Sequence, residues 1–191
     1  MFKFKQIVLT LFAALAFSFV VANSSYSNSL PSPPIFIQEF LGQVDFVEGR
    51  LTQLLEAMLQ DQMSWTPAEG VRTCGQIYLH VAEANHMLAG FMSGAEMEGE
   101  PGSMEKSTTD KEEIAKMLKD SFAAIKEAAG KLTEEDLDKI TKTPFGMDMS
   151  LRNFMISLLN HSHEHLGQGI AYARMNGVVP PWSEKQEGEG G

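Results

Sequence analysis

Apolar side chains recur at intervals of three and four residues along most of the chain between residues 35 and 182. These intervals keep the side chains on one face of an α-helix, and no segment shows the strict alternation typical of a half-buried strand. A first helix is predicted over about 35–63. Its apolar positions are Phe40, Val44, Phe46, Val47, Leu51, Leu54, Leu55 and Met58. The pattern therefore predicts an all-α protein.

Loop signals separate this helix from the next two. Pro67 and Gly70 mark a loop, because both residues interrupt regular structure. A second helix is predicted over about 73–92, ending near Gly94. The stretch 96–108 is polar and contains Gly and Pro, so it is expected to form a long loop.

Capping patterns locate the following helices. Thr109, with Glu112 three residues later, has the spacing of a capping box and predicts the start of a third helix that ends near Gly130. Thr133 and Asp136 have the same spacing and predict a short helix of about two turns.

The last long helix is predicted to begin at Ser150, after chain breaks at Pro144 and Gly146. It should end at Gly177, in the position favoured for a left-handed cap, and the proline pair that follows prevents continuation. Four long helices with one apolar stripe each predict a four-helix bundle.

The N-terminal residues 1–22 have the features of a signal peptide. Lys3 and Lys5 supply a positive start, 7–21 form a short apolar stretch, and small residues precede a cleavage point near Ala22. The apolar stretch is shorter than the roughly 20 residues of a membrane-spanning helix. We therefore expect an exported protein, periplasmic or extracellular, with no membrane span after cleavage. An uncleaved N-terminal anchor is the alternative.

The two ends of the chain differ in composition from its middle. Residues 23–34 are rich in Ser, Asn and Pro and are predicted to be a disordered linker. Residues 183–191 are rich in Gly and Glu and are predicted to be a disordered tail. The bundle domain is thus predicted to span 35–182.

Charge and cysteine content exclude some classes of function. The formal net charge is −10, from 15 basic and 25 acidic residues. Nucleic-acid binding needs clustered Lys and Arg, so nucleic acid is not expected as a partner. Cys74 is the single cysteine of the sequence, so neither a C-x-x-C motif nor an intramolecular disulfide exists. A small buried hydrophobe is its expected role, with a reactive thiol as the alternative.

The histidines carry the strongest indication of chemistry. His161 and His165 are four residues apart, which places them only about 40° apart around one helix face. His80 shares an apolar face of the second helix, whereas His163 and His86 are predicted to point elsewhere. Two imidazoles on one helix and a third from a facing helix can bind one metal ion. From spacing alone, hydrogen-bonded core histidines are the alternative.

A family resemblance rests on the segment 159–181, which reads LNHSHEHLGQGIAYARMNGVVPP. It resembles the closing helix of the DinB/YfiT-like family, roughly N-H-x-x-x-H-R-G-Q, a short spacer, L-R, N-G and a proline. The matching residues are Asn160, His161, His165, Gly167, Gln168, Arg174, Asn176, Gly177 and Pro180. Leu166 stands where the family usually has Arg. The segment 64–86 resembles the family's second-helix region, where the first ligand falls on His80.

The resemblance implies a bundle in up-down-down-up order, commonly dimeric, with a three-histidine site for zinc, nickel or another divalent ion. Characterised members of the family include thiol-dependent transferases and an isomerase, and the family name does not imply DNA chemistry. A metal-dependent hydrolase or thiol-dependent transferase acting on a small molecule is therefore expected. A non-enzymatic metal- or ligand-binding bundle is the alternative, and a plain bundle with packed histidines is a third. Glu83, Glu164 and Gln168 are candidates for supporting contacts around the ligands.

We expect the mature protein to begin near Asn23, because the features of residues 1–22 direct export and cleavage. N-terminal sequencing of the protein purified from its own host measures this directly. Recovery of intact Met1 in a soluble cytoplasmic fraction would contradict the prediction.

Overall fold

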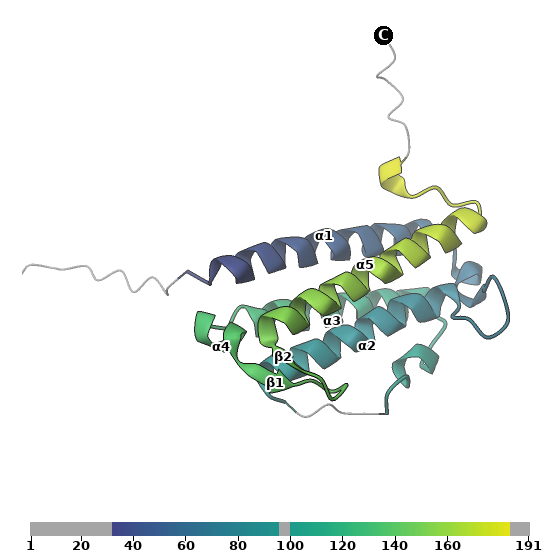
Figure 1. Ribbon diagram of the computed structural model, residues 1–191. Helices are drawn as coiled ribbons and strands as arrows, with labels where there is room; N and C mark the ends of the chain where they lie inside the picture. The colour runs from purple at the N-terminus through teal and green to yellow at the C-terminus, as the bar shows by residue number, and fades with distance from the viewer. Residues whose placement is uncertain (1–31, 96–99, 184–191) are drawn as a thin grey trace, which may run out of the picture. The chain divides into compact units, whose positions relative to one another are not determined.

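The computed structural model describes residues 32–95 and 100–183; the predicted signal peptide, residues 23–31 of the predicted linker and all but the first residue of the predicted tail lie outside these ranges. Four long helices dominate (Figure 1): α1 (Ile35–Ala57), α2 (Cys74–Ser93), α3 (Lys111–Ala129) and α5 (Leu151–Met175). The shorter elements are η1 (Gln60–Ser64), η2 (Met104–Lys106), α4 (Glu134–Asp138), β1 (Ile140–Lys142), β2 (Asp148–Ser150) and η3 (Pro181–Ser183). The predicted all-α fold class is confirmed.

The four long helices run up, down, down and up. At the end of α1, the Lys111 ammonium at the start of α3 donates to the carbonyl of Met58. At this same end Gln62 donates to the carbonyl of Asn176, which follows α5. The start of α2 reaches this end through a short loop (Figure 1). Consequently α2 and α3 are parallel to each other and antiparallel to α1 and α5, and the long connection between α2 and α3 returns along the bundle.

The core contains most of the stripe predicted for the first helix. Its buried positions in α1 are Ile37, Phe40, Val44, Val47, Leu51, Leu54 and Leu55. Phe46 is the exception, with 51% of its surface exposed, because Val47 occupies the inward direction next to it. The predicted inward position of Phe46 is therefore wrong, whereas the rest of the stripe is confirmed.

The first helix is shorter than its periodicity predicts. It ends at Ala57, Met58 is extended, and the separate 3-10 helix η1 follows. Met58 and Met63 are both almost fully buried, yet on one continuous helix they would lie about 140° apart. The break lets both side chains enter the core. The side chain of Gln62 accepts from the Leu59 N–H and caps the new turn.

The helix starts agree with the capping patterns at two of three positions. Thr133 and Asp136 form the predicted capping box of α4, and Ser150 accepts from the N–H of Asn153 at the start of α5. The third helix differs, because Asp110 rather than Thr109 accepts from the N–H of Glu113. A carboxylate one residue further along provides the stronger acceptor for the positive end of a helix.

The chain between α4 and α5 forms a short antiparallel hairpin that the sequence pattern did not predict. Strands β1 and β2 have three residues each and pair Ile140 with Ser150. Alternation over three largely exposed residues is too short to indicate a strand. Gly146 completes the turn with φ of 81°, a conformation that favours glycine, and its N–H donates to the Thr143 carbonyl.

Two glycines allow helices to approach closely. A Cβ on Gly169 of α5 would lie 3.3 Å from Leu54 Cδ2 and 3.9 Å from Tyr78 Oη. A Cβ on Gly75 of α2 would lie 2.9 Å from Ile114 Cδ1. Backbone therefore packs directly against side chains where α5 meets α1 and where α2 meets α3.

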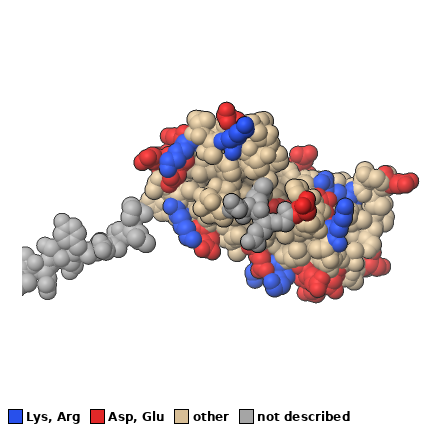
Figure 2. Space-filling model, turned by 90° about the horizontal axis from the view of Figure 1, so that it is seen from below, with Lys and Arg blue, Asp and Glu red and all other residues tan. Residues whose placement is uncertain are grey.

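The surface is of mixed charge. On the face drawn in Figure 2, Lys and Arg side chains are scattered among Asp and Glu and do not gather into one basic area. Within the described ranges, no helix combines the length and the apolar character that a membrane crossing requires.

Replacing Asp110 with Ala should lower the free energy of unfolding by about 1 kcal/mol, because the first turn of α3 loses its capping acceptor. Chemical denaturation monitored by circular dichroism measures the change. Thr109→Ala is the matched control and should stay within about 0.5 kcal/mol, since the exposed Thr109 side chain does not cap the helix. A larger loss for Thr109→Ala than for Asp110→Ala would restore the sequence-based assignment.

Candidate metal centre

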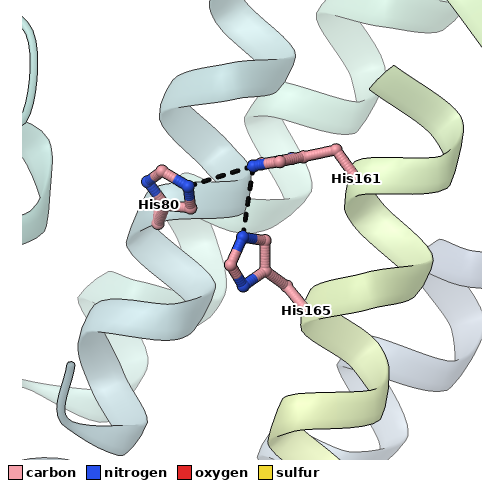
Figure 3. A group of neighbouring side chains, drawn as sticks. All are labelled: His80, His161 and His165. Carbon is pink, nitrogen blue, oxygen red and sulfur yellow. Dashed lines mark hydrogen bonds between the residues drawn. The ribbon is translucent and has the colours of Figure 1, made fainter. Parts of the chain in front are cut away.

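Three histidines converge between two of the long helices. His80 projects from α2, and His161 and His165 project from successive turns of α5 toward it (Figure 3). The Nε2 atom of His161 lies 3.0 Å from His80 Nε2 and 3.1 Å from His165 Nε2. One ligand atom from each ring lies within 4.8 Å of the others. Residues 81 positions apart in sequence thus meet at one point.

The other two histidines lie outside this group, as their helical positions predict. The ring of His163 stacks on Phe46, and its Nδ1–H donates to the carbonyl of Leu159. His86 is exposed on α2. By contrast His165 is buried, and His80 and His161 are half-buried. The three converging imidazoles therefore lie on the core-facing sides of α2 and α5.

Hydrogen bonds fix the tautomers of two of the rings. Nδ1 of His165 lies 2.8 Å from Oε1 of Gln168, so this nitrogen donates. Nδ1 of His80 lies 2.6 Å from a carboxylate oxygen of Glu105, which can only accept. In a neutral imidazole the other nitrogen then carries a lone pair. His80 and His165 therefore both present an Nε2 lone pair to His161.

His161 is left with unmet hydrogen-bonding capacity. Its Nδ1 is buried and has no partner among the described residues. If Nδ1 carries the proton, a donor is buried without an acceptor and three lone pairs face one another. If Nε2 carries it, one hydrogen is shared between two acceptors and the Nδ1 lone pair has no donor. A cation at the point of convergence would satisfy all three Nε2 atoms at once.

Electrostatics favour the neutral form of His161 and of His80. Burial and repulsion from His165, His80 and Arg72 lower the pKa of His161 to about 4. Burial and Arg72 likewise lower the pKa of His80, although Glu105 acts in the opposite direction. Protons thus compete poorly for these nitrogens near neutral pH. Neutral imidazole is the form that binds metal ions.

An ion pair supports His80 from the loop side. The guanidinium of Arg72 donates through Nε to Oε2 of Glu105 at 2.9 Å and through Nη2 to Oε1 at 3.0 Å. Burial alone would raise the pKa of Glu105, but its hydrogen bonds with Arg72 and His80 together lower it. Glu105 is therefore an anion, placed in η2 on the connection between α2 and α3.

Neither Arg72 nor Glu105 is indicated by the sequence pattern. The loop after α2 contains glutamates at positions 96, 98, 100 and 105, and no spacing rule distinguishes one of them. Arg72 stands just before the cap of α2 and has no periodic partner. Only the path of the loop brings these two side chains together with His80.

The three residues predicted to support the ligands lie in different places. Gln168 contacts His165 and also donates to the Tyr172 hydroxyl at 3.2 Å. Glu83 accepts from the N–H of Gly102 at 2.6 Å and so holds the loop backbone instead of a histidine. Glu164 has an exposed side chain. Of the three, Gln168 is the one in hydrogen-bond contact with the histidine group.

The described residues supply three donors to the candidate group. Over residues 32–95 and 100–183, His80, His161 and His165 form a candidate group without a fourth His, Cys, Asp or Glu. The side chain of His80 is 24% exposed, so solvent reaches the group. Three imidazole nitrogens with one open position suit zinc, nickel and related divalent ions. Leu166, at the position where Arg is usual in the resembling family, is buried in the core.

Comparison with family models identifies one family, and solved structures show the same fold. The model of the DinB superfamily matches residues 43–168. A solved DinB-like protein from Bacillus cereus is 26% identical, with a TM-score of 0.66, over 76% of this chain and 95% of that one. A conserved protein from Enterococcus faecalis (14% identical, TM-score 0.63) matches over 72% of this chain and 95% of its own. A DinB-like protein from Bacillus subtilis (20% identical, TM-score 0.59) matches over 78% of this chain and 99% of its own. No curated protein matches the chain.

Cys74 should be unreactive in the folded protein. Its side chain is buried at the start of α2, and burial raises the pKa of the thiol to about 11. We expect an aromatic disulfide reagent at mildly alkaline pH to label the native protein far more slowly than the denatured protein, because only thiolate reacts. Absorbance of the released thiol measures the rate. Equal rates in the two states would instead support the reactive-thiol alternative.

Proposed function

This chain belongs to the DinB superfamily, and from that premise we propose that it binds one divalent metal ion through His80, His161 and His165 and uses it in catalysis on a small molecule. The observation that carries the proposal is the convergence of three Nε2 atoms, two of which have lone pairs fixed by hydrogen bonds on the far side of the ring. Hydrogen bonds among the three rings leave Nε2 lone pairs without donors, whereas a cation would give each of the three Nε2 lone pairs a partner.

Hydrolysis is the reaction class that the site supports best. A divalent ion with an open position lowers the pKa of a bound water toward neutrality and supplies a nucleophile. The absence of a fourth residue donor in the described part of the chain supports this reading over a closed structural site. Thiol-dependent transfer, which family resemblance suggests, is the second candidate. Zinc or nickel is the ion we propose.

The histidines around the proposed ion have different roles. The two α5 histidines hold it rigidly, since His165 is buried and bonded to Gln168. His80 contributes from the opposite helix and lies at the solvent-facing side. The buried faces of α2 and α5 exclude water from behind the site. A small substrate would therefore approach from the side of His80 and the loop that follows α2.

Export and self-association complete the proposal. The signal-peptide features of residues 1–22 support action outside the cytoplasm. The small thiols that transferases use are mainly cytoplasmic, whereas hydrolysis needs only water. Export therefore favours hydrolysis over thiol-dependent transfer. A homodimer is proposed from the family resemblance.

Each of His80→Ala, His161→Ala and His165→Ala should weaken metal binding by at least about tenfold, because each removes one of three residue donors. His163→Ala and His86→Ala remove the same chemical group outside the convergence and should retain about one ion per chain. Metal content after identical reconstitution with zinc, determined by mass spectrometry, compares the five variants. Loss of metal from His163→Ala with retention in His161→Ala would refute the assigned ligands.

Cobalt-loaded protein distinguishes the enzyme from a closed binding site. Addition of azide or a small thiol should change the visible absorption of the loaded protein, because an open position accepts an exogenous ligand. His163→Ala should give the same change as the unaltered protein. An unchanged spectrum at saturating azide and thiol would favour the non-enzymatic alternative.

A further inference from the structure

We propose that Glu105, held by Arg72, is the positioning residue for His80: it fixes the orientation and tautomer of this ring and thereby sets the affinity of the metal centre. The inference rests on the proposed function, because it concerns a ligand of the proposed ion. It adds a carboxylate and a guanidinium from the chain outside α5, and Glu105 lies outside both segments that carry the family resemblance.

His80 is the ligand that most needs an external support. His161 and His165 share one helix, so their spacing is fixed by backbone hydrogen bonds. His80 stands alone on α2, and 24% of its side chain is exposed, so the core does not enclose its ring. The hydrogen bond between His80 Nδ1 and Glu105 Oε1, at 2.6 Å, supplies the missing constraint. A carboxylate behind an imidazole also makes the ring a stronger metal ligand.

Arg72 determines how Glu105 can act. Its two parallel hydrogen bonds occupy both carboxylate oxygens and hold the carboxylate plane in one orientation. Nη2 of Arg72 also lies 3.2 Å from His80 Nδ1, because both groups donate to the same oxygen. Because hydrogen bonds engage both Oε1 and Oε2, Glu105 supports the ligand His80 and is not itself a ligand of the proposed ion. The positive charge of Arg72 also balances the negative charge of Glu105. The proposed ion therefore keeps its electrostatic attraction for an anionic ligand.

The loop around Glu105 is held in place independently. Glu83 of α2 accepts from the N–H of Gly102, three residues before Glu105, and Gly102 has φ of 80°, which favours glycine. The Lys106 N–H donates to the carbonyl of Ser103 just beyond. The η2 turn therefore presents Glu105 to α2 from a defined backbone. This arrangement gives the long connection between α2 and α3 a direct role at the site.

The test compares two glutamates of the same loop. Glu105→Gln should weaken zinc binding by about tenfold or more, in the range found for lost supporting contacts to metal ligands. Glu100→Gln makes the same change of charge at an exposed position and should stay within about twofold. Competition with a chromophoric chelator measures both dissociation constants. The proposal is overturned if Glu105→Gln stays within that twofold limit, or if Glu100→Gln loses as much affinity.

A second readout reports the orientation of the ring itself. Nitrogen NMR of histidine-labelled protein should show the His80 proton on Nδ1 in the metal-free unaltered protein, and this signal should shift in Glu105→Gln but not in Glu100→Gln. A proton on Nε2 of His80 would overturn the inference. If the unaltered protein fails to bind zinc, the proposed metal function fails, while the NMR result still decides whether Glu105 positions His80.

Discussion

The close approach of α5 to α2 is the constraint on which the rest of the site depends. An imidazole ring is short, so Nε2 atoms from two helices come within 3.0 Å only where the helices pack tightly. Gly169 follows His165 by one turn and lets Leu54 of α1 pack against the backbone of α5, with the Tyr78 hydroxyl of α2 in ordinary contact nearby. The same apolar contacts that stabilise the bundle therefore hold the three nitrogens together, and this preorganisation removes ordering cost from ligand binding.

Periodicity alone predicted most of the bundle, because each long helix buries one continuous stripe. It failed where the local pattern and the tertiary structure diverge. The stripe continues past Ala57, but Met58 and Met63 can both reach the core only if the helix breaks. The hairpin between α4 and α5 has strands too short to leave a pattern. Asp110 and Thr109 are both good caps, and only the register of α3 chooses between them.

In the candidate site, too, a contact between residues close in sequence could be predicted, whereas a supporting contact between residues distant in sequence could not. The spacing of His161 and His165 is local, so the sequence indicated the pair, and Gln168 lies one turn beyond on the same helix. Glu83 and Glu164 were equally near in sequence, yet one holds the loop and the other is exposed. Glu105 reaches His80 across 25 residues of chain. No local spacing encodes such a contact, because it depends on the path of a loop.

The distribution of ligands along the chain has a consequence for folding. His161 and His165 form a two-donor site in any segment that becomes helical, whereas His80 is 81 residues from its partner. Closing a loop of that length costs an unfolded chain several kcal/mol of entropy, of order 4 by the loop-closure estimate. An ion captured early would thus hold a single helix without its third donor. Complete coordination of the proposed ion would therefore require the finished topology, so the three-histidine site would favour the native structure over misfolded forms.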